Sequence, residues 1–265
     1  MSKQLSSFSS KKDIVKLVDH TSSIVEEQIV IEKAITIYLN EEEFVTMVCS
    51  PGFEQELLLG FLASEGVITK KADVLKVRWD ECEGLVWVET KARALGQKLF
   101  LKRYLTSCCG KGRSSFYFAN DARLTKKIQS SLQITAEDVY KYSRMLEEHS
   151  EVFRLTGGVH GGAIAAEGDF EFYAYDIGRH NILDKLYGWA LEQELDLSYK
   201  ALMFSGRISS EILIKTGKMG CPILIGRSAP TDLALNLAEE LGITVIGFAR
   251  ENRMNIYTYP ERIIR

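Results

Sequence analysis

Three short apolar runs in the second half of the chain constrain its fold more than any other feature. They lie between segments of helical pattern, at residues 201–204, 222–225 and 243–248. Strands that alternate with helices of about 10–15 residues form βαβ units, which build a largely parallel sheet covered by helices. Thr135 and Asp138 also match a capping box, which opens a helix that continues toward His149. The sequence therefore predicts an α/β domain over residues 121–265.

The first half of the chain has a different pattern. Residues 1–28 are polar, with a serine-rich start, and are expected to form a flexible N-terminal tail. Residues 29–120 are predicted to form an α+β domain. Its expected elements are two strands of a hairpin, a helix and two more strands, at 34–39, 44–49, 50–66, 74–79 and 85–90. The domain ends in a loop at 106–115 that has no large apolar side chain and should be exposed and mobile.

An arginine follows each apolar run of the second half within a few residues. These are Arg207, Arg227 and Arg250, while Arg179 precedes a further predicted helix. In open α/β sheets, ligands bind outside the carboxyl ends of the strands, and guanidinium groups donate paired hydrogen bonds that match phosphate oxygens. A single arginine of this kind is commonly a solvated surface residue, but the repetition predicts a binding site for a polyanion.

A glycine-rich segment surrounds one histidine. Residues 156–162 place glycines on both sides of His160, which favours a tight turn whose amides could hold an anion. A simple connection between a helix and a strand explains the segment equally well. His160 and His180 could act as general acids or bases, although a lone histidine is more often a structural hydrogen-bond donor.

The loop at 106–115 contains two adjacent cysteines, Cys108 and Cys109, near Lys111 and Arg113. Nearby cations lower the pKa of a thiol and so raise the fraction of thiolate, which is the form that attacks sulfur. No second pair of Cys or His accompanies the loop, so no metal site is predicted. An exposed pair without function is the alternative. The remaining cysteines lie in or beside apolar runs and are expected to be inert: Cys49, Cys82 and Cys221.

The charge balance gives no reason to expect binding to nucleic acid or to a membrane. With 33 Lys and Arg against 36 Asp and Glu, the net charge is −3, and any anion site must be local. No segment has the apolar length of a signal peptide or of a membrane span. A cytoplasmic protein is expected.

Several segments together resemble the formate dehydrogenase accessory sulfurtransferase family, FdhD/NarQ. They are TSCCGK, TGGVHGG, DIGRHNILDK, SGRISSE, SAPT and GFARENRMNIYTYPERI. The resemblance implies a cytoplasmic homodimer that accepts sulfur as a persulfide from a cysteine desulfurase. It then implies transfer of that sulfur to the molybdenum bis-(molybdopterin guanine dinucleotide) cofactor, before the cofactor is inserted into formate dehydrogenase.

The resemblance also implies that the second domain has the three-layer α/β/α fold of cytidine deaminases without their zinc. Zinc deaminases carry a His-x-Glu motif and a later Pro-Cys-x-x-Cys motif. Here Gly161 and Gly162 follow His160, and Cys221 precedes Pro222 alone. Deamination is therefore not expected.

The family's sulfur-bearing cysteine falls in the loop at 106–115. Matching the following Gly110-Lys111 favours Cys109, whereas matching the preceding Thr106-Ser107 favours Cys108. The family's cofactor-binding stretch falls on Phe248, Ala249, Arg250, Glu251, Asn252 and Arg253. Further expected contacts to the phosphates, base or ribose are Arg207, Arg227, Asp176 and Asn255. The alternatives are a cofactor-binding chaperone without thiol chemistry and a nucleotide hydrolase, for which no phosphate loop is present.

Overall fold

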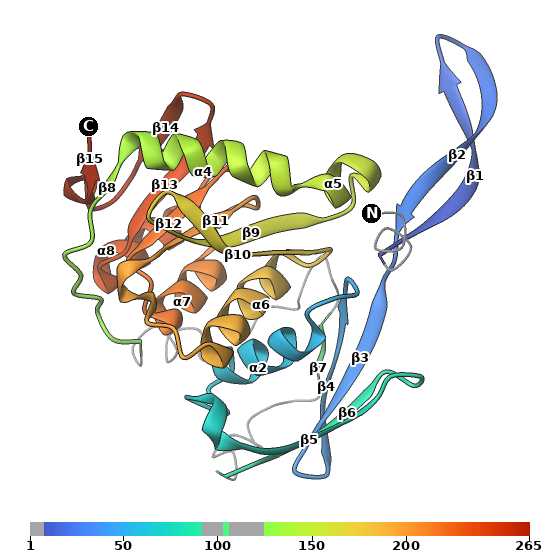
Figure 1. Cartoon of the computed structure of the whole chain (residues 1–265), viewed down its shortest axis with the longest axis horizontal. Helices are drawn as coiled ribbons and strands as arrows, with labels where there is room; N and C mark the ends of the chain where they lie inside the picture. The colour runs from blue at the N-terminus through green and yellow to red at the C-terminus, as the bar shows by residue number, and fades with distance from the viewer. Residues whose placement is uncertain (1–7, 92–102, 106–124) are drawn as a thin grey trace.

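The computed structural model describes residues 8–91, 103–105 and 125–265, with residues 103–105 described in their backbone alone. The described chain forms a two-stranded hairpin, a five-stranded sheet with one helix, and a six-stranded sheet with helices on both faces (Figure 1). This arrangement confirms the predicted α/β class. Cys108 and Cys109 lie outside the described residues.

The N-terminal hairpin consists of β1 (Ser9–Val18) and β2 (Thr21–Val30) and projects away from the rest of the molecule (Figure 1). The prediction of a flexible tail over residues 1–28 is therefore wrong from Ser9 onward. Asp19 and His20 form the turn with φ values of 47° and 66°. Turns with two positive φ values are usually signalled by Asn-Gly or Asp-Gly, so Asp-His gave no hairpin signal.

The five-stranded sheet has the order β5-β6-β3-β4-β7. Its elements are β3 (Lys33–Leu39), β4 (Glu42–Cys49), α2 (Glu54–Ser64), a 3₁₀ turn (Lys71–Asp73), β5 (Val74–Asp80), β6 (Leu85–Thr90) and β7 (Arg103–Leu105). Alternate residues of β3 are buried, namely Ile35, Ile37 and Leu39, because successive side chains of a strand point to opposite faces. The predicted β3–β4 hairpin, the helix and the following two strands are confirmed.

The six-stranded sheet has the order β10-β9-β11-β12-β13-β14, and β11, β12 and β13 are parallel as predicted. Its strands are β9 (His160–Ala166), β10 (Asp169–Asp176), β11 (Ala201–Phe204), β12 (Ile223–Gly226), β13 (Thr244–Arg250) and β14 (Arg253–Ile256). Its helices are α4 (Ala136–His149), α5 (Glu151–Thr156), α6 (Arg179–Glu192), α7 (Ser210–Met219) and α8 (Asp232–Leu241). A separate two-stranded parallel sheet pairs β8 (Ile134–Thr135) with β15 (Ile263–Ile264), and 3₁₀ turns lie at Leu197–Tyr199 and Pro260–Arg262.

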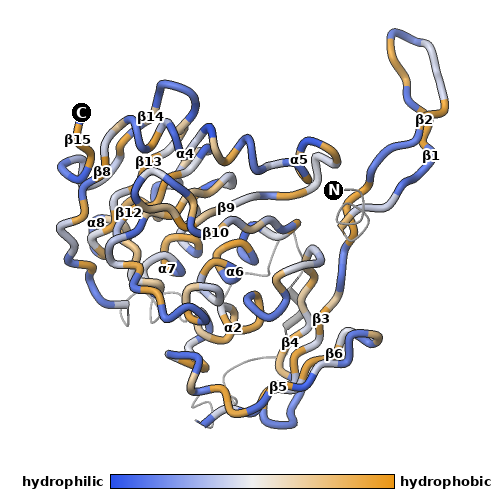
Figure 2. Tube along the Cα trace, viewed as in Figure 1, coloured by the Kyte–Doolittle hydropathy of each residue, from blue (hydrophilic) through white to orange (hydrophobic). Residues whose placement is uncertain are grey.

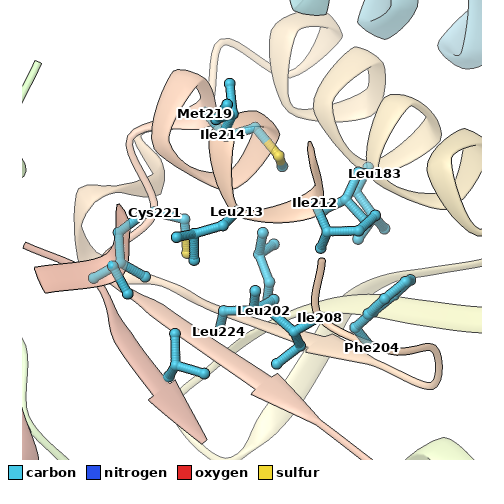
Figure 3. Close-up of a cluster of buried hydrophobic side chains, with 14 of the residues drawn as sticks. Leu183, Leu202, Phe204, Ile208, Ile212, Leu213, Ile214, Met219, Cys221 and Leu224 are labelled. Atoms are coloured by element: carbon cyan, nitrogen blue, oxygen red, sulfur yellow. The ribbon is translucent and has the colours of Figure 1, made fainter. Parts of the chain in front are cut away.

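The core of this sheet lies on both faces, which gives three layers. Leu202 and Phe204 of β11 pack toward α6, α7 and α8 (Figure 3), whereas Ala201 and Met203 pack toward α4. Burying one large apolar side chain contributes roughly 1.5–3 kcal/mol. Apolar residues concentrate along these inner strands (Figure 2). The predicted capping box is also confirmed, because the hydroxyl of Thr135 accepts a hydrogen bond from the backbone N–H of Asp138 at 3.0 Å.

The two sheets are joined by close packing of α2 on α6. A Cβ atom on Gly60 would lie 1.7 Å from the carbonyl oxygen of Asp184, and one on Gly188 would lie 1.8 Å from that of Glu56. Only glycine allows the backbones to approach so closely. Tyr187 of α6 packs on the cores of both parts. The parts that the sequence divides at residue 120 therefore share a tight interface.

Candidate functional site

A cavity of about 750 Å³ lies at the carboxyl ends of β11, β12 and β13. The C-terminal end of α4, the short helix α5 and the start of β9 close its other sides. The polar residues that line it include Glu147, His160, Ser205, Arg227, Ser228 and Arg250. The volume falls within the range of about 300–1,000 Å³ that is usual for small-molecule sites.

Arg227 is placed in the cavity by the strand that precedes it. Its backbone N–H donates to the carbonyl oxygen of Phe204 at 3.0 Å, which fixes the start of the loop after β12. Its guanidinium group forms an ion pair with the carboxylate of Glu147 on α4. Arg250, at the end of β13, has no carboxylate partner within the described residues. Arg154 also lines the cavity. Of these three arginines, Arg227 has a carboxylate partner and Arg250 has none among the described residues.

Arg154 of α5 holds the end of α4 in place. Its guanidinium group donates to the carbonyl oxygens of Glu147 and Glu148, at 3.2 Å for Glu148. The last carbonyl groups of a helix have no partner within the helix, and cations are favourable beside them. This contact fixes the wall of the cavity that carries Glu147.

His160 and Ser205 form the part of the wall nearest to β9. The hydroxyl of Ser205 accepts from the backbone N–H of Gly161 at 3.0 Å and lies 3.4 Å from Nδ1 of His160. Burial lowers the pKa of His160, and the positive charge of Arg179 lowers it further. A neutral imidazole can donate a hydrogen bond to a ligand through one ring nitrogen or accept one from it through the other.

The predicted cofactor-binding stretch forms the end of β13, a turn and the start of β14. Of the residues in this stretch, Arg250 lines the cavity. Ala249 is fully buried and its carbonyl oxygen accepts a hydrogen bond from Ser143, whereas Phe248 is partly exposed in a left-handed conformation with φ of 52°. The remaining members have exposed side chains on the turn or just after it: Glu251, Asn252 and Arg253.

Two of the other predicted contacts lie outside the cavity wall. Arg207 is exposed on the loop after β11. Asn255 is exposed on β14, and its side-chain amide donates to the hydroxyl of Tyr257 at 3.3 Å. The structure thus brings Arg227 and Arg250 together in the cavity wall, and Arg207 is not part of that wall.

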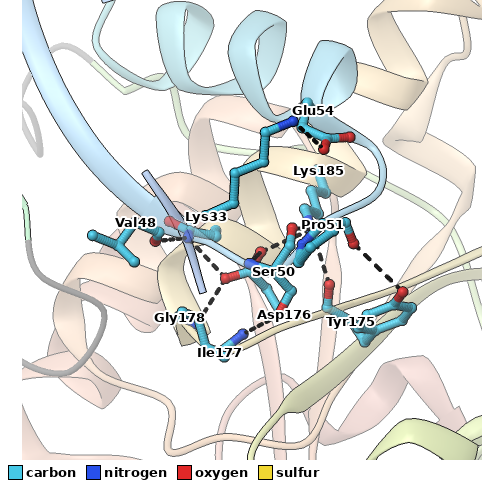
Figure 4. Close-up of polar contacts among 11 residues, drawn as sticks. Lys33, Val48, Ser50, Pro51, Glu54, Tyr175, Asp176, Ile177, Gly178 and Lys185 are labelled. Atoms are coloured by element: carbon cyan, nitrogen blue, oxygen red, sulfur yellow. Dashed lines mark hydrogen bonds and ion pairs between the residues drawn. The ribbon is translucent and has the colours of Figure 1, made fainter. Parts of the chain in front are cut away.

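Asp176 is fully buried at the junction of the two sheets (Figure 4). Its carboxylate pairs with the buried ammonium group of Lys185 at 2.8 Å. It also accepts from the backbone N–H groups of Ser50 at 3.0 Å and Gly178 at 2.8 Å, and from the side-chain amide of Asn181 at 2.8 Å. The carboxylate is fully occupied by these contacts, so it holds β4 against the start of α6.

The described cysteines differ in exposure. Cys49 and Cys221 are buried, and burial raises the pKa of each thiol to about 12, as expected for inert residues. Cys82 is exposed on the turn between β5 and β6, against the expectation from its neighbours. Among the described residues, no group of three His, Cys, Asp or Glu side chains could hold a metal ion.

Sequence reasoning missed the contribution of α4 and α5 to the cavity. Neither Glu147 nor Arg154 belongs to a motif that the sequence analysis identified, and their role depends on how α4 crosses the sheet. Within the described residues, no helix combines the length and apolar character that crossing a membrane requires.

Comparisons with known proteins agree with one another. The sequence model of the FdhD/NarQ family matches residues 30–264. The Sulfur carrier protein FdhD of Halalkalibacterium halodurans is 46% identical over 255 residues, which cover 96% of this chain and 94% of that protein. That of Bacillus subtilis is 44% identical over 253 residues, which cover 95% and 96%. A crystal structure of a candidate formate dehydrogenase accessory protein from Desulfotalea psychrophila has the same fold, with a TM-score of 0.80, 22% identity and coverage of 97% of this chain and 100% of that one.

Proposed function

Because the chain belongs to the FdhD/NarQ family, we propose that it is a sulfur carrier that matures formate dehydrogenase. In this proposal, Cys108 or Cys109 receives sulfur as a persulfide from a cysteine desulfurase. The protein then passes this sulfur to the molybdenum bis-(molybdopterin guanine dinucleotide) cofactor, which it binds as a substrate. It acts in the cytoplasm as a homodimer, with formate dehydrogenase as the recipient.

The thiol chemistry rests on the sequence of the loop and on the burial of two of the other cysteines, Cys49 and Cys221. Cys108 and Cys109 have Lys111 and Arg113 nearby, and such cations favour the reactive thiolate. Cys49 and Cys221 are unsuitable because burial raises the pKa of each to about 12. The loop thiolate attacks the outer sulfur of the donor persulfide and the donor leaves as a thiolate.

Delivery of that sulfur requires a second thiol. When another thiol attacks the inner sulfur of the carrier persulfide, the two form a disulfide and the outer sulfur leaves at the oxidation level of sulfide. Atoms and electrons balance in this step without a metal ion or redox group of the protein's own. The partner thiol comes from a second protein or from a small thiol, because adjacent cysteines are poorly placed to form a disulfide with each other.

One observation supports the proposal that the protein binds the cofactor: Arg227 and Arg250 line the same cavity at the ends of parallel strands. Two guanidinium groups with the hydroxyls of Ser205 and Ser228 suit a diphosphate, because charge-assisted bonds from arginine match phosphate oxygens. His160 closes the same wall and can contact the attached nucleoside. A guanosine diphosphate group is the part of the cofactor that this cavity would hold.

Formate dehydrogenase activity in a host that lacks its own copy of this protein tests the proposal. The double variant Cys108→Ala/Cys109→Ala should yield inactive dehydrogenase, and Cys49→Ala should restore activity as the wild type does. Binding of guanosine diphosphate should weaken in Arg250→Gln. Full activity of the double variant together with normal nucleotide binding would instead favour the chaperone that binds the cofactor without thiol chemistry.

A further inference from the structure

The N-terminal hairpin of β1 and β2 is an arm that stands apart from both cores (Figure 1). Among the described strands its two strands pair only with each other. Each strand has 10 residues, so the arm is about 33 Å long. A two-stranded hairpin alone in water is marginally stable and needs a further surface to pack against. The arm therefore calls for a surface that covers it.

The base of the arm is held against the rest of the molecule. The ring of Phe8 packs edge-on against that of Tyr175, with the ring centroids 5.6 Å apart. A Cβ atom on Gly158 would lie 2.7 Å from Cγ1 of Val30, so Val30 lies directly against the turn that follows α5. β2 also contacts α5 itself. The arm therefore leaves the molecule at a fixed place beside α5.

One face of the arm ends in an exposed apolar group, the tip cluster, which consists of Val15, Leu17 and Ile24. Val15 and Ile24 lie opposite each other in the register, and Leu17 shares their face because alternate residues of a strand point the same way. The exposed fractions of Val15, Leu17 and Ile24 are 71%, 67% and 77%. Contiguous exposed apolar side chains commonly mark an interaction site. On the opposite face, Val18 at the tip and Ile29 at the base are exposed separately.

A second exposed apolar group, the α5 patch, lies beside the base of the arm. It consists of Phe153 and Leu155, which are 51% and 40% exposed. Val30, which lies against the end of α5, is six residues from Ile24 on the same strand and therefore shares the face of the tip cluster. This face thus has apolar side chains at both of its ends, with the α5 patch beside its base.

The middle of the same face is charged. Lys11, Asp13 and Glu26 lie between its two apolar ends, and Lys11 forms an ion pair with Glu26. Asp13 forms no ion pair with a cation of the described residues. The order along the face is therefore apolar, charged and apolar, which is the same from either end. Such a face is complementary to itself when a two-fold axis turns one copy onto another, as an isologous interface requires.

We propose that the arms of two copies of this chain pack antiparallel about a two-fold axis, so that the tip cluster of each arm covers the α5 patch of the other copy. The charged middles then face each other, with Asp13 opposite Lys11 of the partner subunit. Phe153 also lines the cavity, so each arm borders the cavity of the other copy. The inference rests on the proposed function only for the homodimer, and it is independent of the sulfur chemistry.

The area of this contact suits a stable dimer. One face of the arm presents the side chains of five of the ten register pairs. Burying a Val, Leu or Ile side chain removes about 60–120 Å² of apolar surface. Together with the α5 patch, each copy contributes on the order of 800 Å², the usual size of one side of a specific interface.

Analytical ultracentrifugation of the whole chain over a range of protein concentrations tests this contact. The wild type should sediment with twice the mass of one chain. Val15→Ser/Ile24→Ser should raise the dissociation constant of the dimer by at least about 100-fold, because each dimer loses four buried apolar side chains. Leu155→Ser, which changes the surface that the tip covers, should raise it by about tenfold or more. Val18→Ser/Ile29→Ser changes the opposite face of the same arm and is the matched control, which should dimerise as the wild type does.

The outcomes separate this inference from the function proposed above. A dimer that Val15→Ser/Ile24→Ser leaves unchanged, or that the control weakens equally, would overturn the contact between arms and leave the homodimer to another surface. A dimer that Leu155→Ser leaves unchanged would overturn the contact of the tip cluster with α5. A monomeric wild type would overturn both the contact and the homodimer, whereas sulfur transfer would still depend on the loop cysteines. Should the substituted arm unfold, Leu155→Ser still tests the contact, because it lies outside the arm.

Discussion

Replacing Asp176 by asparagine should destabilise the protein severely, because its carboxylate joins the two sheets. Asp176 and Lys185 are both fully buried and their charged atoms lie 2.8 Å apart. The variant Asp176→Asn removes the charge and leaves the ammonium group of Lys185 buried without its counterion. It also replaces one oxygen that accepts hydrogen bonds by an amide group that donates them.

The magnitude follows from the burial of the pair. Breaking a buried pair by removing one partner costs about 3–5 kcal/mol, a large part of a typical total stability of 5–15 kcal/mol. For a domain of 150–250 residues, about 1 kcal/mol lowers Tm by roughly 2–4 °C. A fall in Tm of about 6–20 °C is therefore expected. The double variant Asp176→Asn/Lys185→Met should be less destabilised than the sum of its single variants, because no unpaired charge stays buried.

Thermal unfolding followed by circular dichroism measures these effects, with urea titration to confirm the free energy of unfolding. Lys76→Met is the matched control, because Lys76 pairs with Glu89 at 3.7 Å on an exposed surface where a pair contributes about 0–1 kcal/mol. A fall in Tm of less than about 3 °C for Asp176→Asn, or simple additivity in the double variant, would refute the reasoning.

Three other changes test separate parts of the structure. Glu147→Gln should tighten the binding of guanosine diphosphate by up to about fivefold, because a partly exposed pair with Arg227 contributes at most about 1 kcal/mol; weaker binding in calorimetry would contradict this competition. Gly60→Ala should lower the free energy of unfolding by roughly 3 kcal/mol or more, because the new methyl group would lie 1.7 Å from a carbonyl oxygen of α6; an unchanged urea midpoint would exclude such close packing. Iodoacetamide at pH 8 should leave Cys49 and Cys221 unmodified in the native protein, since a thiol with a pKa of about 12 is ionised in only about one molecule in ten thousand. Peptide mass spectrometry measures the alkylation of each cysteine. Alkylation of either one would show that its surroundings open to solvent.

The parallel centre of the second sheet could be predicted because its strands carry their own signal. Each is a short, fully apolar run between amphipathic helices, and this pattern has few alternative folds. The sheet edge at which Arg227 and Arg250 meet follows from the same reasoning. The capping box at Thr135 is equally local, since both of its hydrogen bonds lie within four residues.

The remaining features depend on contacts between distant residues. Spacing shows that Arg207 follows a strand end, but the direction in which its side chain leaves the loop depends on the neighbouring loop after β12. Asp176 has the same sequence signal whether it binds a ligand or a buried lysine nine residues later. The role of Glu147 requires knowledge of how α4 crosses the sheet. No local pattern specifies these long-range contacts.

The central claim is that a cysteine of the loop carries sulfur, and intact-protein mass spectrometry tests it most directly. The wild type, the single variants Cys108→Ala and Cys109→Ala, and the double variant Cys108→Ala/Cys109→Ala would each be incubated with a cysteine desulfurase and cysteine. We expect the wild type to gain about 32 Da, one sulfur atom, which reductant removes and which one of the two single variants cannot acquire. A protein that gains no sulfur, or that gains it equally when both cysteines are replaced, would contradict the account.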